Sequence, residues 1–284
     1  MNQRIKILFL VVMLGLGSAY YFRADIDEWR RSAGSEIGQG IDLLKIAEPQ
    51  INTAPPLRGP VREVPSTLTV SGTIKETNMA RQENGFMALS VNAKLTRAAE
   101  AKVDDMFNRQ YFEHESPTGV GAGDLADNVG YEYLMIGENL ALGNYEDDKA
   151  LVEAWMNSPG HRANILRPHY TEIGVAVKRG LYEGRTVWLA VQEFGRPQSD
   201  CPSPSESLNV EIEADKNRLD ELSKQLSPAE EEIRNSRPKR GPAYRQKVDA
   251  YNELVRLYNT LADETEILIT RYNDQISAYN ACLQ

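Results

Sequence analysis

The sequence predicts an α+β domain in the middle of the chain, followed by an antiparallel hairpin of two long α-helices. Apolar residues from about Asn92 to Asn108 fall on one face of a helix. Residues 173–177 and 187–191 alternate apolar and other side chains around a turn at Gly180–Gly184, which is typical of a β-hairpin. Beyond Cys201 the chain has few glycines, many charges and apolar residues at heptad spacing. Helices followed by an antiparallel strand hairpin favour a layered α+β domain over a doubly wound sheet.

The first two helices of this domain have sequence signals at their ends. Thr73 and Glu76 form a Thr-x-x-Glu capping box, so a short helix is expected to begin there and to end at Asn84-Gly85. A longer helix follows, and its inward face is expected to consist of Leu95, Ala98, Ala99, Lys102, Met106 and Phe107.

Residues 1–23 are expected to be a signal peptide or an N-terminal membrane anchor. Arg4 and Lys6 precede an apolar run from Ile7 to Phe22, whose length lies between that of a signal-peptide core and that of a bilayer span. The aromatic end of the run, Tyr20–Phe22, slightly favours an uncleaved anchor. Positive charge before the run places the amino end inside and the remainder outside the cytoplasm.

Residues 24–68 are expected to be a Pro-rich, semi-extended linker, and residues 69–197 the α+β domain. The linker would hold the domain away from a membrane. The chain has a net charge of -9, so it has no overall basic field for binding nucleic acid, and none is expected as a partner.

Residues 201–284 predict an α-helical coiled-coil hairpin. Its first helix is expected to restart at Ser227-Pro228, and Arg237–Pro242 is expected to form the turn. The first helix has its seam on Leu208, Ile212, Leu219, Leu222, Leu226 and Ile233. The seam of the second is Tyr244, Val248, Tyr251, Val255, Tyr258, Ala262, Thr265, Ile269, Tyr272, Ile276 and Tyr279.

Cys201 and Cys282 are the two cysteines of the chain, and they lie equally far from this turn. They are therefore expected to meet at the open end of the hairpin. In an exported protein such a pair predicts a disulfide, which would stabilise the fold by roughly 4.5 kcal/mol on a chain-entropy argument. The alternative is two unpaired buried thiols.

Three histidines, His114, His161 and His169, all lie in the α+β domain within four short motifs. In chain order these are YFEHESP from Tyr111, GENLA from Gly137, AWMNSPGHRANIL from Ala154 and HYTEIGV from His169. Their order and spacing resemble bacterial members of the CAP superfamily, also called the SCP or cysteine-rich secretory protein, antigen 5 and pathogenesis-related family. The resemblance covers the α+β domain and extends to neither the linker nor the helical hairpin.

This resemblance implies an α-β-α sandwich whose cleft holds two histidines and two acidic residues that can bind a divalent metal, often zinc. His114 matches the first histidine, and Glu138 matches the glutamate of the Gly-Glu-Asn motif. His161 lies in the Ser-Pro-Gly-His-Arg motif of bacterial members, and His169 lies where animal and plant members have a His-Tyr-Thr-Gln histidine. Many eukaryotic members carry the second glutamate at the position of Ser158, so the eukaryotic set is incomplete here.

The residues around His161 give a separate argument. Ser158 and Pro159 are typical of a helix N-cap and first position, which places His161 in the first turn. The helix dipole there disfavours imidazolium and leaves a neutral ring, and two neutral imidazoles with a carboxylate suit zinc. The alternative is a hydrogen-bonded network of the histidines with Glu138 that fixes the cleft without a metal.

Three functions remain open. The favoured one is an extracytoplasmic binding module, anchored or secreted, whose cleft takes an apolar ligand or an envelope lipid, glycan or protein. The chain has no Gly-x-Ser-x-Gly elbow, His-Glu-x-x-His pair or catalytic cysteine beside the histidines, which argues against an enzyme. The second is a metal-assisted hydrolase with histidine ligands and Glu138 as the catalytic general base. The third is a structural protein whose tyrosine-rich hairpin docks a partner.

Overall fold

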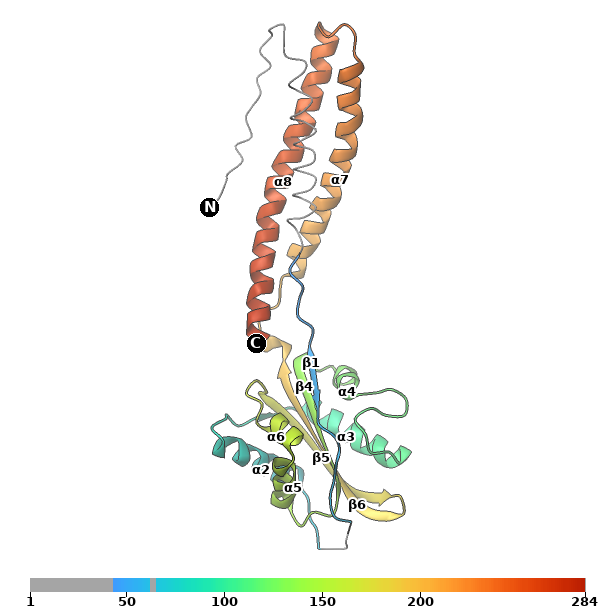
Figure 1. Ribbon diagram of the computed structural model, residues 1–284, viewed down its shortest axis with the longest axis vertical. Helices are drawn as coiled ribbons and strands as arrows, with labels where there is room; N and C mark the ends of the chain where they lie inside the picture. Colours follow the sequence, from blue (N-terminus) through green and yellow to red (C-terminus); the bar gives the residue numbers. More distant parts are fainter. Residues whose placement is uncertain (1–42, 62–64, 284) are drawn as a thin grey trace. The chain divides into compact units, whose positions relative to one another are not determined.

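The computed structural model describes residues 43–61 and 65–283 (Figure 1). The expected signal peptide or anchor at residues 1–23 lies outside the described residues, as does the first part of the expected linker. The chain divides into two compact units, which we call the sheet unit and the hairpin unit. Of the described residues, the sheet unit comprises those of Ile46–Glu206 with 274–283, and the hairpin unit comprises Ser207–Asn273 with 43–45. Within the described ranges, no helix is both long and apolar enough to cross a bilayer.

The described part of the sheet unit contains a six-stranded sheet with the order β1-β4-β6-β5-β3, in which β2 also pairs with β4. The three long strands, β4, β6 and β5, are antiparallel to one another, and the short strands pair in parallel with β4 or β5. The strands are β1 (Gln50–Thr53), β2 (Leu57–Arg58), β3 (Ser90–Val91), β4 (Tyr133–Gly143), β5 (Glu172–Tyr182) and β6 (Arg185–Pro197).

Helices pack on both faces of this sheet (Figure 1). Successive side chains of a strand point to opposite faces, so neighbouring residues of β4 pack into the hydrophobic clusters on opposite faces of the sheet. Ala141 belongs to the cluster with Trp155 of α5, and Leu140 belongs to the cluster with Met106 of α3. The helices are α2 (Val70–Glu83), α3 (Ala93–Arg109), α4 (Ala122–Asn128), α5 (Asp148–Asn157), α6 (Pro159–Ile165) and the 3-10 turn η1 (Gln198–Asp200).

The predicted α+β class and the strand hairpin are confirmed. Strands β5 and β6 are joined at Glu183-Gly184, where φ is 46° and 75°, as the two central residues of a type I′ turn require. Gly180, which was expected in the turn, lies within β5. The long helix is α3, and the Asn92 side chain caps it by accepting from the main-chain N–H of Lys94 at 2.8 Å.

The predicted start of the first helix was wrong by one turn. Helix α2 begins at Val70, and its N-cap is Thr69, whose hydroxyl accepts from the main-chain N–H of Gly72. Thr73 lies inside the helix and donates to Asp148, which also accepts from the main-chain N–H of Thr69 at 2.9 Å. The true start thus depends on a carboxylate 79 residues away, which a local capping pattern cannot show.

The second half of the expected linker is part of the sheet unit. Residues 50–53 and 57–58 form β1 and β2, and Ala54 between them is buried. Pro55 and Pro56 fall between the two strands, where their missing N–H groups remove no ladder hydrogen bond. The prolines therefore interrupt an edge of the sheet rather than mark a free linker.

The two predicted C-terminal helices are present as α7 (Glu206–Asn235) and α8 (Pro242–Leu283). Helix α7 runs through the exposed Pro228, so the expected restart at Ser227-Pro228 is wrong. One lost main-chain hydrogen bond is tolerated there because helix-forming alanine and glutamates follow. Seam residues far from the turn, including Leu219 and Thr265, are buried, whereas Tyr251 nearer the turn is half-buried.

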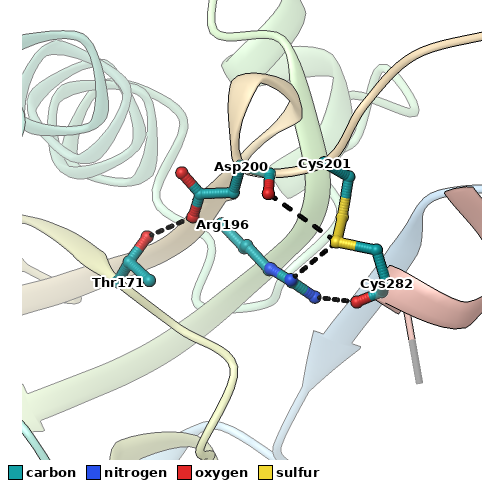
Figure 2. The surroundings of a disulfide bond; sticks show 5 residues. All are labelled: Thr171, Arg196, Asp200, Cys201 and Cys282. Atoms are coloured by element: carbon teal, nitrogen blue, oxygen red, sulfur yellow. Dashed lines mark hydrogen bonds between the residues drawn. A yellow bond between two sulfur atoms is a disulfide. The ribbon is translucent and has the colours of Figure 1, made fainter. Parts of the chain in front are cut away.

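The predicted disulfide joins Cys201 to Cys282 with a Cα–Cα distance of 5.9 Å (Figure 2). Both cysteines belong to the sheet unit. Arg196 of β6 donates to the main-chain carbonyl of Cys282 at 2.7 Å, and Tyr279 packs in a buried cluster with Leu134 of β4. The last turns of α8 are therefore fixed to the sheet by covalent, polar and apolar contacts.

Candidate functional site

The candidate site lies at an interruption in the edge of the sheet. Strand β1 leaves β4 after Thr53, and β2 joins it again at Leu57, so Ala54–Pro56 make no pairs with β4. A side chain added at Gly160 would place its Cβ 2.9 Å from the Cβ of Ala54. The start of α6 therefore fits closely against this interruption, which brings the α6 histidine to the edge of β4.

His114 and Glu138 are joined directly, as the resemblance implied. His114 follows α3 in a loop, and its Nδ1 lies 2.6 Å from Oε1 of Glu138 in the middle of β4. Its Nε2 donates to the carbonyl of Ala54. Because that nitrogen must carry a proton, the Nδ1 contact needs a second proton, held by the imidazole or by Glu138. The side chain of His114 is 17% exposed and that of Glu138 is 0% exposed.

Glu193 is a site residue that sequence reasoning missed. It pairs with Glu138 across β4 and β6, and both residues are fully buried. Burial raises the pKa of Glu193 well above its ordinary value, and the neighbouring Glu138 carboxylate raises it further. The sequence contained one signal for Glu193. Val187, Leu189 and Val191 are every second residue of a strand and face the core, and Glu193 is the next residue in that series.

Lys102 is the cation of this buried group. It lies on the inward face of α3, is 1% exposed, and donates to the main-chain carbonyl of His114. Burial lowers the pKa of Lys102, while the carboxylates of Glu138 and Glu193 act against that effect. Lys102 therefore holds the His114 loop and partly neutralises two adjacent carboxyl groups.

His161 lies in α6 beside the same group and is 1% exposed. Its Nδ1 is 2.7 Å from the hydroxyl of Ser158, the N-cap predicted for this helix. Burial, and then the nearby His114, lower the pKa of His161 to about 4. The expected neutral ring is therefore supported, but burial is its first cause, whereas the prediction rested on the helix dipole.

A buried amide network ties α6 to the sheet. The Asn139 side chain donates to the carbonyl of His161 at 3.2 Å and to Gln192 at 3.0 Å. Asn164 of α6 donates to the carbonyl of Glu138 at 3.2 Å, and Gln192 donates to Thr77 at 2.7 Å. This network fixes the main chain on both sides of the candidate site.

His169 stands apart from the other predicted site residues. It is half-buried in the loop between α6 and β5, and no hydrogen bond or ion pair joins it to His114, Glu138 or His161 in the described structure. Across residues 43–61 and 65–283, no three His, Cys, Asp or Glu side chains are placed to share one metal ion. Of the predicted network, only the hydrogen bond between His114 and Glu138 joins a histidine side chain to Glu138 in the described structure, and zinc binding stays a prediction.

Several atoms of the group are buried without a hydrogen-bond partner among the described residues. They are Oε2 of Glu138, Nε2 of His161 and both carboxyl oxygens of Glu193. Such atoms are costly in a folded protein and concentrate at functional sites. The arrangement can hold a proton between the carboxyl groups and keep His161 neutral.

An open pocket of about 300 Å³ lies beside His114, and we call it the acidic pocket. Glu115, Asp124 and Asp127 supply three carboxylates to its wall, and no lysine or arginine of the described residues lines it. The negative field is felt by Tyr133, whose pKa is raised by burial and then by Asp127 and Asp124. The other lining residues are Ile51, Thr53, Gly121, Ala122 and Gly123.

The model of the Cysteine-rich secretory protein family, CAP, matches residues 74–194. Among curated relatives, the uncharacterized protein YkwD of Bacillus subtilis (strain 168) is 40% identical over 121 residues, which are 43% of this chain and 44% of that protein. The uncharacterized membrane protein YlbC of the same organism is 35% identical over 106 residues, 37% of this chain and 30% of that protein. The chain therefore spans less than half the length of either relative.

Two solved structures are similar to part of the chain. An extracellular protein containing an SCP domain from Bacillus anthracis str. Ames has 29% identity and a TM-score of 0.39, covering 45% of this chain and 40% of that one. An outer surface protein from Borrelia burgdorferi has 19% identity and a TM-score of 0.39, covering 44% of this chain and 90% of that one.

Proposed function

Because residues 74–194 belong to the cysteine-rich secretory protein (CAP) family, we propose that the chain is an extracytoplasmic binding module. Its ligand is an envelope molecule held in the acidic pocket beside His114. The pocket is the observation that carries this proposal, since it is the accessible feature next to a fixed polar group. The similarity to an uncharacterized membrane protein agrees with a role at the cell envelope.

The lining of the acidic pocket selects the chemistry of its ligand. The side chains of Glu115 and Asp127 make no hydrogen bond or ion pair with another described residue, whereas the Asp124 side chain accepts from the main-chain N–H of Gly121 at 2.8 Å. Two free carboxylates favour a cation or a strong hydrogen-bond donor. Ile51 and Ala122 offer a small apolar wall. The ligand is therefore an envelope glycan or peptide that presents an amine, rather than an anionic headgroup.

Binding is better supported than catalysis by the burial of the polar group. Glu138 and Glu193 are 0% exposed and His161 is 1% exposed, so no substrate touches them without rearrangement. Both ring nitrogens of His114 are already engaged within the chain. A general base must reach the proton that it removes, and this arrangement provides no such reach. The buried group instead fixes the wall of the pocket.

The proposal is tested by titrating the isotope-labelled full chain with two peptides, Ala-Ala-Ala and its N-acetylated form, and recording amide NMR shifts. We expect the free amine to shift signals of residues 121–127, and Asp127→Asn to weaken its binding about three- to tenfold, as loss of one charged contact implies. Glu153→Gln is the matched control, because Glu153 is exposed on α5 and does not line the pocket. Equal shifts with both peptides would contradict an amine site.

Metal-assisted hydrolysis is the second candidate, and the unpartnered atoms of Glu138 and His161 favour it. A carboxylate oxygen and an imidazole nitrogen are zinc ligands, but the described residues do not place a third one with them. Elemental analysis of the purified full chain decides between the two. About one zinc per chain, lost in both Glu138→Gln and His161→Asn, would support this candidate, and absence of zinc after purification with added Zn²⁺ would exclude it.

A further inference from the structure

The turn between α7 and α8 concentrates positive charge in an otherwise acidic chain. Residues 234–247 contain six basic residues and no Asp or Glu, whereas the rest of the chain has 26 basic and 41 acidic residues. Four of these cations, Arg237, Lys239, Arg240 and Arg245, are exposed, and we call them the basic tip. They lie in or beside the turn between α7 and α8, which Figure 1 shows at one end of the helical hairpin.

The basic tip is not neutralised by the described part of the chain. Its two flanking cations are paired: Arg234 lies 3.9 Å from Glu231, and Lys247 lies 3.0 Å from Glu232. None of the four tip residues forms an ion pair with a described residue. Arg237 donates to two main-chain carbonyls at the end of α7, at 3.1 and 2.8 Å, and these acceptors carry no net charge.

Stability of the two helices accounts for only part of this charge. Cations are favourable near the C-terminal end of a helix, which explains Arg237 after α7. Arg245 lies in the first turn of α8, and Arg240 lies just before it. That end of a helix favours acidic residues, yet the first turn of α8 has none. Arg240 and Arg245 therefore interact unfavourably with the dipole of α8. Because helix stability does not explain their charge, it indicates an external anion.

We propose that the basic tip docks on a membrane surface that contains anionic phospholipids. Guanidinium groups match phosphate through paired hydrogen bonds, and clusters of about four to eight Lys and Arg bind anionic headgroups. The four side chains are exposed in or beside the turn that joins the two helices, where they are accessible to a planar array of headgroups. Tyr244, half-buried in the first turn of α8, has the aromatic body and polar tip that suit a membrane interface.

The test is flotation of the full chain with vesicles of phosphatidylcholine alone or with roughly 30% phosphatidylglycerol. The wild-type chain should bind the anionic vesicles at least about tenfold more strongly, and this preference should fall at high ionic strength. Replacement of all four tip cations by glutamine should remove at least about nine-tenths of the preference. The variant is Arg237→Gln, Lys239→Gln, Arg240→Gln and Arg245→Gln.

A matched control removes four exposed cations elsewhere on the same helices. It is Arg218→Gln, Lys224→Gln, Arg256→Gln and Arg271→Gln, and it should keep the wild-type preference. Circular dichroism checks that both variants keep their helix content. The proposal is overturned if wild type binds both vesicles equally, if the two variants lose binding alike, or if soluble polyphosphate at equal phosphate concentration binds more tightly than the vesicles.

Discussion

The sheet unit and the hairpin unit are stabilised in different ways. In the sheet unit, segments far apart in sequence bury side chains completely, and even charged groups such as Lys102 and Glu193 lie in the interior. In the hairpin unit, burial is confined to a narrow seam, and exposed ion pairs join residues three or four apart, as between Lys224 and Asp220. Non-local packing creates a site with shifted pKa values, whereas local pairing leaves a charged surface.

The largest effect should follow from Trp155→Ala in the sheet unit. Trp155 is fully buried, and its indole N–H donates to the carbonyl of Leu140 at 3.3 Å. The resulting cavity should lower the free energy of unfolding by about 3–5 kcal/mol. Chemical denaturation of the full chain, followed by tryptophan fluorescence for the sheet unit and by helical circular dichroism for both units, measures it. An equal shift of a separate hairpin transition would show that the units do not differ as described.

The disulfide should contribute the next largest effect. It closes a loop across a sequence separation of 81, so Cys201→Ser with Cys282→Ser should lower stability by about 2–4 kcal/mol. Thermal unfolding with and without reductant checks this, because reductant should destabilise the wild type and leave the double variant unchanged. If reductant has no effect on the wild type, the covalent link does not stabilise the native fold.

Acid should weaken the sheet unit through His161. Its pKa is about 4 in the folded chain against about 6.5 when unfolded, so the unfolded state binds more protons between these values. Stability contributed by the neutral ring is therefore lost as pH falls from 6.5 towards 4, by about 2–3 kcal/mol in total. His161→Asn should flatten this part of the curve of unfolding free energy against pH. His169→Asn is the control, and an unchanged slope in His161→Asn would contradict the prediction.

The smallest of these effects is expected in the hairpin unit. Leu226 of α7 is half-buried, so Leu226→Ala should lower the free energy of unfolding by about 1 kcal/mol. Leu222→Ala, at a buried position of the same seam, should cost about 2–3 kcal/mol and serves as the comparison. The measurement is helical circular dichroism in denaturant, and equal losses would mean that the seam is packed evenly up to the turn.

Features that depend on local pattern were predicted well from the sequence. Helix α3 and the β5–β6 hairpin follow from periodicity, and the Cys201–Cys282 disulfide follows from symmetry about the turn. Features that depend on distant partners were not. The start of α2 depends on Asp148, and the short strand β1 gains its pairing from β4. A four-residue strand carries too little periodicity to be recognised alone.

The candidate site shows the same division. His114, Glu138 and His161 were identified through motifs, and the structure brings them together. Glu193 was missed because its importance arises from its cross-strand position opposite Glu138, which requires the register of β4 and β6. His169 was identified through a motif of its own, but it lies in the loop between α6 and β5, and no hydrogen bond joins it to the other three residues in the described structure.

The attachment of α8 has a consequence for the integrity of the chain. Because a disulfide joins Cys282 to Cys201, both ends of the helical hairpin are attached to the sheet unit. A protease that cuts once between these cysteines produces two fragments that remain one molecule until the bond is reduced. A single cut in the hairpin therefore does not release it from the sheet unit.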